Sequence, residues 1–330
     1  MRVLQEKDYR LFEKLVSLSE KEMVRAMTQL IKSKYDNVIA TKDYIIAIGD
    51  IPIALVAHMD TVFKFPVSDL YYDQRKGVLW SPEGLGADDR AGIFAIIKIL
   101  QDGLRPSVIL TTGEEEGGVG ACAICDKYPE CPIPGLKYMI QLDRRGTNDC
   151  VFYDCYCPEF VDYVESFGFC ERWGSFTDIS FLMPEWQIVG VNLSVGYEDE
   201  HSKQEILNIN PLFDTIKKVK KMLTEKEIPD FIYDELVAAN SAWWKKAGDW
   251  FGQHCSKCKK IHSEYELFPV LGLDGKTKFY CPDCIVGNVE WCDMCGEPFE
   301  LKEHTGKKLC KECEEELCTT STPSKTNSAK

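Results

Sequence analysis

The chain of 330 residues contains no run of eighteen or more apolar residues, so we expect no transmembrane helix. Its first residues, MRVLQEKDYRLFEKL, lack the apolar stretch of a secretory signal, which predicts a cytoplasmic protein. Basic residues are scarce, because 39 Lys plus Arg face 53 Asp plus Glu. The resulting net charge of −14 argues against nucleic acid or an anionic membrane as a partner.

Histidine is also scarce. The chain has five histidines, and only His58 and His201 precede a cysteine-rich segment that begins at residue 255. Both lie beside carboxylates, in AHMDTV and YEDEHSKQE. So few imidazoles in acidic surroundings make these two residues candidates for metal ligands.

The apolar pattern predicts strands that alternate with helices. Helical spacing occurs in residues 8–35, 88–103 and 209–226, and buried strands are predicted in 51–60, 107–116, 135–146 and 186–197. Residues 37–49 and 69–81 have the pattern of strand pairs. This order indicates an α/β fold, with a mixed central sheet and helices on both faces.

Acidic side chains follow several of the predicted strands. They are Asp88 and Asp89 in GLGADDRAG, Glu114 and Glu115 in TTGEEEGG, and Asp143 in IQLDRRG. Functional groups of such sheets gather beyond the carboxyl ends of the strands, where clustered carboxylates are costly unless cations neutralise them. Two imidazoles with several carboxylates suit zinc, manganese or cobalt and are too rich in nitrogen for a calcium site.

Five motifs follow one another within residues 50–210. In order, they are H-x-D, G-A-D-D-x-A-G, G-E-E-x-G-x-x-G-A, a strand-ending Asp and a late His. This order resembles the co-catalytic dizinc exopeptidases, a clan of aminopeptidases, carboxypeptidases and related amidohydrolases. Only residues 144–200 separate the Asp from the late His, too few for an inserted lid domain. The chain therefore resembles the compact aminopeptidase branch of the clan.

The resemblance implies a role for each motif residue. His58 and Asp143 would bind one divalent metal ion, Glu115 and His201 would bind a second ion, and Asp88 would bridge the two ions. Asp60 would orient the His58 ring, and the Asp88–Asp89 peptide bond would be cis. Glu114 would be the general base, whereas Glu116 occupies a variable position and is expected at the surface.

These roles imply the chemistry of a metal-dependent hydrolase. A water held between the two ions would attack the amide bond of a peptide while Glu114 accepts its proton. An aminopeptidase-type exopeptidase is the favoured function. A deacylase or amidohydrolase acting on another C–N bond, such as that of a small N-acyl substrate, is one alternative. A non-catalytic zinc-ribbon adaptor is the other. Asp178, in GSFTDISFL, is a candidate for the border of the substrate pocket.

The segment after residue 254 contains four C-x-x-C pairs, which in a cytoplasmic chain indicate zinc rather than disulfides. The pairs are Cys255/Cys258, Cys281/Cys284, Cys292/Cys295 and Cys310/Cys313. Eight thiolates suit two structural zinc ions, with the first two pairs and the last two pairs forming separate sites, or with alternate pairs cross-braced. Acidic residues outnumber basic ones here, which favours a protein partner or substrate presentation over DNA binding.

These features predict four segments. Residues 1–225 form the dizinc peptidase-like domain, 226–254 a helical connector, 255–318 a zinc-ribbon-like domain, and 319–330 a disordered tail. A looser group of cysteines in the first segment either binds a third structural metal or consists of reduced buried thiols. Its members are Cys122, Cys125, Cys131, Cys150, Cys155 and Cys157.

Overall fold

The computed structural model describes residues 3–153, 155, 157–233, 253–259, 261–262, 268–272, 277–292, 298–301 and 308–309. The chain divides into two compact units, Met1–Ser241 and Ala242–Lys330. Residues 226–233 of the predicted connector are not helical, and the rest of the connector up to residue 252 lies outside the described residues, as does the predicted tail. No described helix is both long and apolar enough to cross a bilayer.

The first unit is built around a mixed sheet of eight strands, in the order β1-β2-β6-β3-β7-β10-β8-β9. These strands are β1 (Val38–Ala40), β2 (Tyr44–Ala47), β3 (Ile51–His58), β6 (Pro106–Thr111), β7 (Tyr138–Arg144), β8 (Asp149–Val151), β9 (Cys170–Glu171) and β10 (Gly190–Ser194). The central strands β6, β3, β7 and β10 are parallel, so their carboxyl ends meet at one edge. Strands β1 and β2 form the predicted antiparallel pair.

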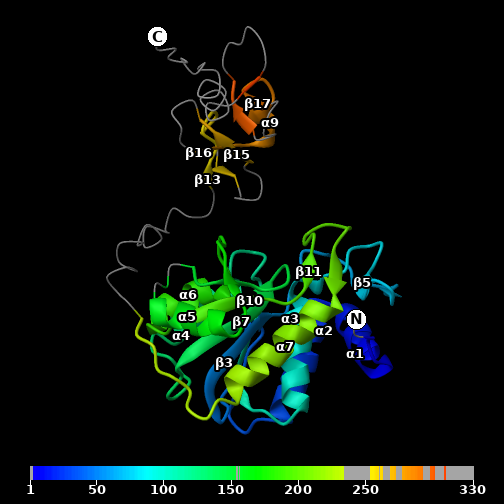
Figure 1. The fold of residues 1–330 in the computed structure, drawn as a ribbon, viewed down its shortest axis with the longest axis vertical. Helices are drawn as coiled ribbons and strands as arrows, with labels where there is room; N and C mark the ends of the chain where they lie inside the picture. Colours follow the sequence, from blue (N-terminus) through cyan, green and yellow to red (C-terminus); the bar gives the residue numbers. More distant parts are fainter. Residues whose placement is uncertain are drawn as a thin grey trace, which may run out of the picture. The chain divides into compact units, whose positions relative to one another are not determined.

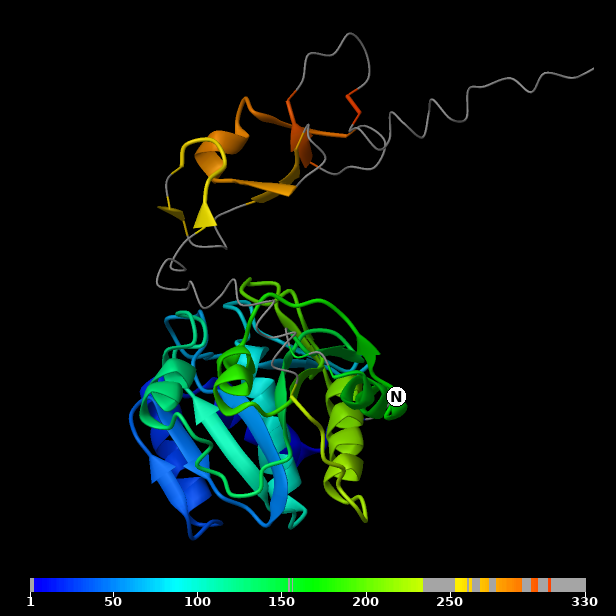
Figure 2. The same ribbon diagram turned by 90° about the vertical axis from the view of Figure 1, so that its left-hand side faces the viewer.

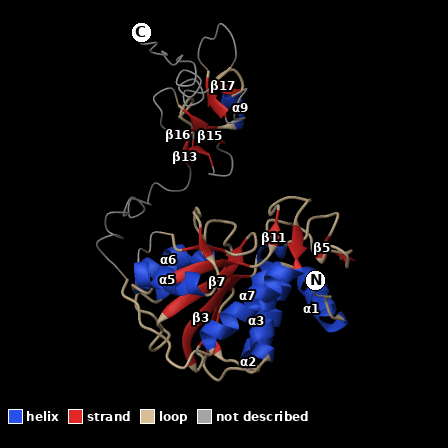
Figure 3. Cartoon of the chain, viewed as in Figure 1, coloured by secondary structure: helices blue, strands red, loops and turns tan. Residues whose placement is uncertain are grey.

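Helices cover both faces of this sheet, which confirms the predicted fold class. Helices α3 (Ala87–Gln101) and α7 (Ile209–Leu223) lie on one face, and α4 (Val119–Lys127) and α6 (Asp178–Trp186) lie on the other (Figure 1, Figure 2). Figure 3 shows the red strands between the blue helices. Because both faces are covered, β6 is buried along its whole length, as a continuous apolar run predicts.

The amino-terminal helical segment is broken in two. The sequence pattern predicts helix throughout residues 8–35, whereas the structure has α1 (Glu6–Val16) and α2 (Glu20–Lys32). Ser19 caps α2 in a capping box, in which the Ser19 backbone N–H donates to Glu22 Oε2 at 3.0 Å. The Ser-x-x-Glu signature therefore ends one helix and starts the next. A further helix, α5 (Pro158–Ser166), occupies the stretch between Asp143 and the second histidine.

A small antiparallel sheet accompanies the main one, in the order β11-β12-β5-β4. Its strands are β4 (Tyr71–Asp73), β5 (Val78–Trp80), β11 (Tyr197–Glu198) and β12 (Ile206–Asn208). Strands β4 and β5 form the hairpin predicted in residues 69–81. Strand β12 pairs with β5, with Leu207 opposite Leu79, and this pairing fixes the position of the loop between β11 and β12.

The described residues of the second unit form short strands and one short helix. They are β13 (Gln253–His254), β14 (Ile261–His262), β15 (Phe268–Leu271), β16 (Thr277–Tyr280), α9 (Pro282–Ile285), β17 (Val289–Trp291) and β18 (Pro298–Glu300). The last four strands form a sheet in the order β16-β15-β18-β17, and β13 pairs with β14. The described apolar clusters here are small and include cysteines, as expected of a metal-stabilised domain.

Candidate metal centre

Five elements deliver the motif side chains to the carboxyl edge of the main sheet. His58 is the last residue of β3, Asp143 lies near the end of β7, and Glu115 follows β6. Asp88 lies at the start of α3, and His201 lies in the loop between β11 and β12. The fold therefore joins residues that are up to 143 positions apart in the sequence.

Asp88 lies between the two histidines. Its Oδ1 is 3.0 Å from His58 Nε2, and its Oδ2 is 3.3 Å from His201 Nε2. His201 Nε2 is also 3.0 Å from Glu115 Oε2, and His58 Nε2 is 3.6 Å from Asp143 Oδ1. The structure thus brings together all five residues that the motif order implied as ligands.

Two groups of possible ligand atoms share His58. One is His58, Asp88 and Glu115, the other is His58, Asp89 and Asp143, and within each group the atoms lie within 4.8 Å of one another. The second group includes Asp89, which the sequence analysis did not assign as a ligand. Both carboxylate oxygens of Asp89 accept backbone N–H groups, from His58 at 3.2 Å and from Gly92 at 2.8 Å. These bonds make Asp89 a support for the β3 end rather than a free ligand.

The backbone around Asp88 is specialised. The Asp88–Asp89 peptide bond is cis, as the resemblance implied. Gly92 allows the next turn of α3 to approach β7, because a Cβ at this position would lie 2.2 Å from the Leu142 carbonyl oxygen. Any larger residue at position 92 would push α3 away from the strand that carries Asp143.

Burial sets the electrostatics of the site. It raises the pKa of Asp143 to about 6, with the nearby charge of Asp88 adding to the effect. Hydrogen bonds to Asp88 and Glu115 raise the pKa of His201 to about 10. Burial lowers the pKa of His58, but the charge of Asp60 and the hydrogen bond and charge of Asp143 outweigh it and raise that pKa well above its usual value. The cluster therefore favours bound positive charge, as protons or as metal ions.

The donor atoms fit a divalent metal. Glu115 Oε1 is buried and accepts no hydrogen bond from the described residues. The Glu115 side chain is only 6% exposed, so water does not readily replace the missing donor. Imidazole nitrogens combined with carboxylate oxygens are the ligands that zinc, manganese and cobalt share. The residues present thus meet the requirements of the implied ions.

Asp60 connects the His58 ring to the loop after β6. Its Oδ1 lies 3.3 Å from His58 Nδ1, on the side of the ring opposite to Asp88. Its Oδ2 accepts the Glu115 backbone N–H at 3.1 Å. This geometry is the one expected of a carboxylate that orients a metal-binding imidazole.

Glu114 is buried beside the cluster. Burial raises its pKa well above the usual value, and the charges of Asp143, Asp178 and Asp88 add to this effect. Its backbone carbonyl accepts the N–H groups of Gly117 and Gly118, which form the turn into α4. Two neighbouring glutamates therefore lie at one site. Glu114 is 7% exposed as a whole residue, and the side chain of Glu115 is 6% exposed.

Several supporting residues escaped the sequence analysis. Asp143 Oδ2 accepts the Thr177 hydroxyl at 2.7 Å, and Asp143 Oδ1 accepts the Tyr197 hydroxyl at 3.1 Å. Buried Glu205 accepts the backbone N–H groups of Gly86 at 2.5 Å and Asp88 at 3.0 Å. The sequence offered little indication of this role for Glu205, because nothing in SKQEIL distinguishes a buried glutamate from one exposed to solvent.

Two further acidic residues have clear surroundings. Asp178 lies outside the cavity described below and is fully buried, where its Oδ2 accepts hydrogen bonds from Thr111 at 2.5 Å and Gln141 at 3.5 Å. Its place at the border of a substrate pocket stays a prediction. Glu116 is exposed, as expected for a surface position, but it also lines that cavity.

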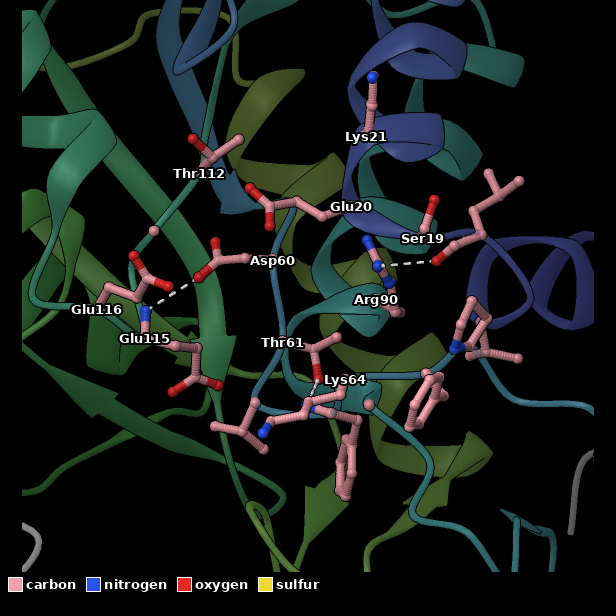
Figure 4. A pocket seen from close by; sticks show the side chains of 18 of the residues that line it. Ser19, Glu20, Lys21, Asp60, Thr61, Lys64, Arg90, Thr112, Glu115 and Glu116 are labelled. Carbon is pink, nitrogen blue, oxygen red and sulfur yellow. Dashed lines mark hydrogen bonds between the residues drawn. The ribbon is translucent and has the colours of Figure 1, made fainter.

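A cavity of about 730 Å³ adjoins the metal centre. Asp60 and Glu115 belong to both, and the other walls come from the start of α2, the loop 61–67 and the loop 112–116 (Figure 4). Buried Arg90 also lines it and donates to the carbonyl oxygens of Met59 and Leu18. Its volume is typical of a pocket for a small ligand.

Four cysteines of the second unit form a compact group. The sulfur atoms of Cys255, Cys258, Cys281 and Cys284 lie within 4.8 Å of one another, which is the predicted combination of the first two pairs. Burial opposes ionisation of Cys255, but the backbone N–H groups of Cys281, Cys258 and Lys257 outweigh it and lower its pKa to about 6. Four thiols at this spacing suit a tetrahedral zinc ion.

The remaining cysteines are less informative. Cys292 packs with Phe299 and Leu309, and its predicted partners Cys295, Cys310 and Cys313 lie outside the described residues. Among the described residues, the looser group of cysteines in the first unit forms no metal-binding cluster. Its members are free thiols, and burial raises the pKa of each one, as for reduced structural cysteines.

Comparison with solved structures identifies the fold. The chain is similar to a tripeptidase from Staphylococcus aureus, with a TM-score of 0.55 and 14% identity over 67% of this chain and 98% of that chain. It is also similar to the aminopeptidase PepT from Bacillus cereus, with a TM-score of 0.51 and 16% identity over 67% and 98% of the two chains. An aminopeptidase from the archaeon Desulfurococcus kamchatkensis gives a TM-score of 0.50 and 15% identity, over 71% and 97%.

These similarities define the class of the fold. The chain has the fold of these peptidases, which confirms for the architecture the resemblance that the motif order implied. No protein-family model matches the sequence, and no curated protein matches it. The fold is therefore shared with peptidases, while the activity has to be argued from the site itself.

Proposed function

We propose that the chain is a metal-dependent hydrolase that cleaves peptide bonds as an aminopeptidase-type exopeptidase. One observation carries this proposal: Asp88 offers one carboxylate oxygen to each of two histidines, in a buried cluster at the carboxyl edge of the sheet. The similar structures support it, because those proteins are described as aminopeptidases and a tripeptidase.

In this proposal the five motif residues hold two divalent ions, zinc or alternatively manganese or cobalt. His58 and Asp143 would hold one ion, Glu115 and His201 would hold the other, and Asp88 would serve both. Asp60 fixes the ring of His58 through Nδ1. The bound ions would supply Lewis-acid stabilisation of the negative charge that develops on the scissile carbonyl oxygen.

Glu114 is the proposed general base. Its carboxylate takes the proton of the attacking water and then delivers it to the leaving amine. Burial raises the pKa of this carboxyl, which makes its carboxylate a stronger base toward the proton of the water. The surrounding apolar strands exclude bulk water, which would otherwise screen these interactions.

The second unit is proposed to bind structural zinc. Cys255, Cys258, Cys281 and Cys284 would hold one ion. The last two C-x-x-C pairs would hold a second ion, a proposal that rests on their spacing in the sequence. A domain with so small an apolar core would draw much of its folding free energy from the metal. We propose that this domain contacts a protein partner or presents the substrate. The proposal also assigns residues 1–225 to the catalytic domain and residues 255–318 to a zinc-ribbon-like domain. It places the protein in the cytoplasm.

A combined metal and turnover assay tests the function. The proposal expects four metal ions per chain by elemental analysis and hydrolysis of amino-acyl anilides. Two zinc ions without hydrolysis would instead support an adaptor, and turnover of N-acyl amino acids alone would support a deacylase. Glu114→Gln should retain its metal and lose about 10²- to 10⁴-fold in kcat, the usual contribution of general acid–base catalysis. Undiminished turnover in that variant would refute the assignment of the base.

A further inference from the structure

Arginines gather on one side of the metal centre. Arg144 and Arg145 directly follow the proposed ligand Asp143, and Arg172 follows β9. In the sheet order β6-β3-β7-β10-β8-β9, the loops after β6 and β3 line the cavity on one side of β7, whereas β8 and β9 lie on the other side. A substrate that spans the metal centre would therefore extend from the cavity toward these arginines.

Arg144 is largely buried and has few acceptors. Its side chain is 21% exposed, and its Nη2 donates to the Trp173 carbonyl oxygen at 3.2 Å. Its Nε–H is buried and finds no acceptor among the described residues. A guanidinium has five N–H donors, so most of the donors of Arg144 are unused. Burying a charged group in this way is costly unless a ligand supplies the missing acceptors.

The carboxylates near Arg144 are shared with other arginines. Asp149 lies 4.0 Å from Arg144 Nη2 and 3.8 Å from Arg172 Nε. Arg145 pairs with Glu200 at 2.8 Å. Outside the metal centre, three guanidinium groups therefore face two carboxylates, and Arg144 has the longest separation from its partner. An anionic group on a ligand would balance this charge.

Tyr153 adds a hydroxyl group to the same region. Its φ of 53° lies in the left-handed region, which aromatic residues rarely adopt. Its hydroxyl accepts an N–H of Asn192 at 2.9 Å, and no described residue accepts the hydroxyl proton. Burial raises the pKa of Tyr153, the charges of Asp143 and Glu114 add to this effect, and the charge of Arg144 opposes it. The hydroxyl is therefore protonated at neutral pH and can donate to a ligand.

The segment 173–177 connects this region to the metal centre. Trp173 accepts the Arg144 hydrogen bond, and its own side chain is 83% exposed. At Gly174 an added Cβ would lie 3.3 Å from the Tyr153 ring, so the backbone packs closely on this ring. Thr177 donates to the proposed ligand Asp143. One short segment thus contacts the guanidinium, the tyrosine and the metal centre.

We propose that Arg144 and Tyr153 bind a carboxylate on the leaving part of the peptide substrate. The guanidinium and the hydroxyl would both donate to this anion, with donors that the protein leaves unused. The inference rests on the proposed function and names a substrate class for it, peptides with a carboxylate near the scissile bond. The carboxylate comes either from the carboxyl terminus of a short peptide or from an acidic side chain, and the two share one chemistry.

Matched pairs of peptides separate these sources. Leucyl-glycylglycine and its amide differ only in the terminal carboxylate. The α-amides of leucyl-glutamate and leucyl-glutamine differ only in a side-chain carboxylate. The metal-loaded full chain should hydrolyse the charged member of at least one pair with a kcat/KM at least about tenfold above that of the neutral member. Equal kcat/KM within both pairs, or a preference for the neutral members, would overturn the inference.

Arg144→Gln and Tyr153→Phe test the residues. Arg144→Gln should reduce the preference for the charged peptide by about tenfold, because it removes the charge, and Arg144→Lys should restore part of it. Tyr153→Phe keeps the ring and should reduce the preference by about threefold, the effect of a neutral donor. Arg25→Gln is the matched control, since Arg25 is exposed on α2 and does not line the cavity. An unchanged preference in both Arg144→Gln and Tyr153→Phe would contradict the assignment.

A binding experiment separates this inference from the proposed function. Calorimetry with leucyl-glycylglycine and its amide on the metal-loaded Glu114→Gln protein measures recognition without turnover. If the wild-type chain hydrolyses nothing, but the free peptide binds more tightly than the amide and Arg144→Gln removes that advantage, the function fails and the carboxylate site remains. A carboxylate bound by a metal ion would keep its advantage in Arg144→Gln. That result, or equal binding of the two peptides and of the two α-amides, refutes the site whatever the activity.

Discussion

Proton release on metal binding is a direct consequence of the two histidines. In the metal-free protein His201 has a pKa of about 10, and His58 has a pKa well above 6.5. The His201 ring is therefore protonated at pH 7.5, and it must lose the proton from its ligating nitrogen before it binds a metal. Filling the proposed pair of sites should release at least about one proton per chain.

The titration should use Mn²⁺ on protein whose thiol site already holds zinc. Carboxylate and imidazole ligands suit Mn²⁺, whereas thiolates prefer softer ions, so the thiol protons do not enter the measurement. Calorimetry in two buffers with different heats of ionisation gives the number of protons released. The number should be at least about one between pH 7 and 8 and fall as the pH rises toward 10, where His201 is already losing its proton in the metal-free protein.

Binding of Mn²⁺ without proton release at pH 7.5 would refute this reasoning. It would mean that the His201 imidazole is neutral before the metal arrives, or that it is not a ligand. The variant His201→Gln serves as the control, because it removes the more exposed of the two rings and should reduce the release by about one proton.

Three further perturbations address separate parts of the structure. His201→Ala should lower the metal content of the first unit by one ion, and unchanged content by elemental analysis would exclude His201 as a ligand. Glu205→Leu should lower the free energy of unfolding in urea by about 2–6 kcal/mol, because it leaves two buried N–H groups without acceptors, whereas Glu205→Gln should cost less; equal stability of the Leu variant and wild type would contradict this. Cys258→Ser should remove one zinc ion and make the second unit sensitive to protease, with Cys170→Ser, an exposed thiol, as control; full zinc content would refute the four-thiol site.

Sequence patterns were most informative for metal-binding residue types that lie at the ends of predicted strands. His58, Asp143 and the Glu114–Glu115 pair each end or follow an apolar strand, and a parallel sheet brings such ends together. Strand ends therefore predicted which residues meet. The late His201 was identified only by its place in the order of motifs, since no strand of the main sheet carries it.

Residues that act through long-range hydrogen bonds could not be predicted. Glu205 bonds to backbone groups 117 and 119 positions away, and Thr177 reaches Asp143 across 34 positions. Neither has a local pattern that separates it from a surface polar residue. The break between α1 and α2, in contrast, has a local pattern in the sequence, the Ser19–Glu22 capping box. It was not predicted because the apolar residues keep helical spacing on both sides of it.

The attachment of the β11–β12 loop to α3 has a consequence for assembly of the site. Glu205 accepts the backbone N–H of Asp88, and His201, four residues earlier, lies beside the Asp88 side chain. Hydrogen bonds between protein groups therefore hold the hairpin against α3, and part of the entropic cost of arranging the ligands falls on folding rather than on metal binding.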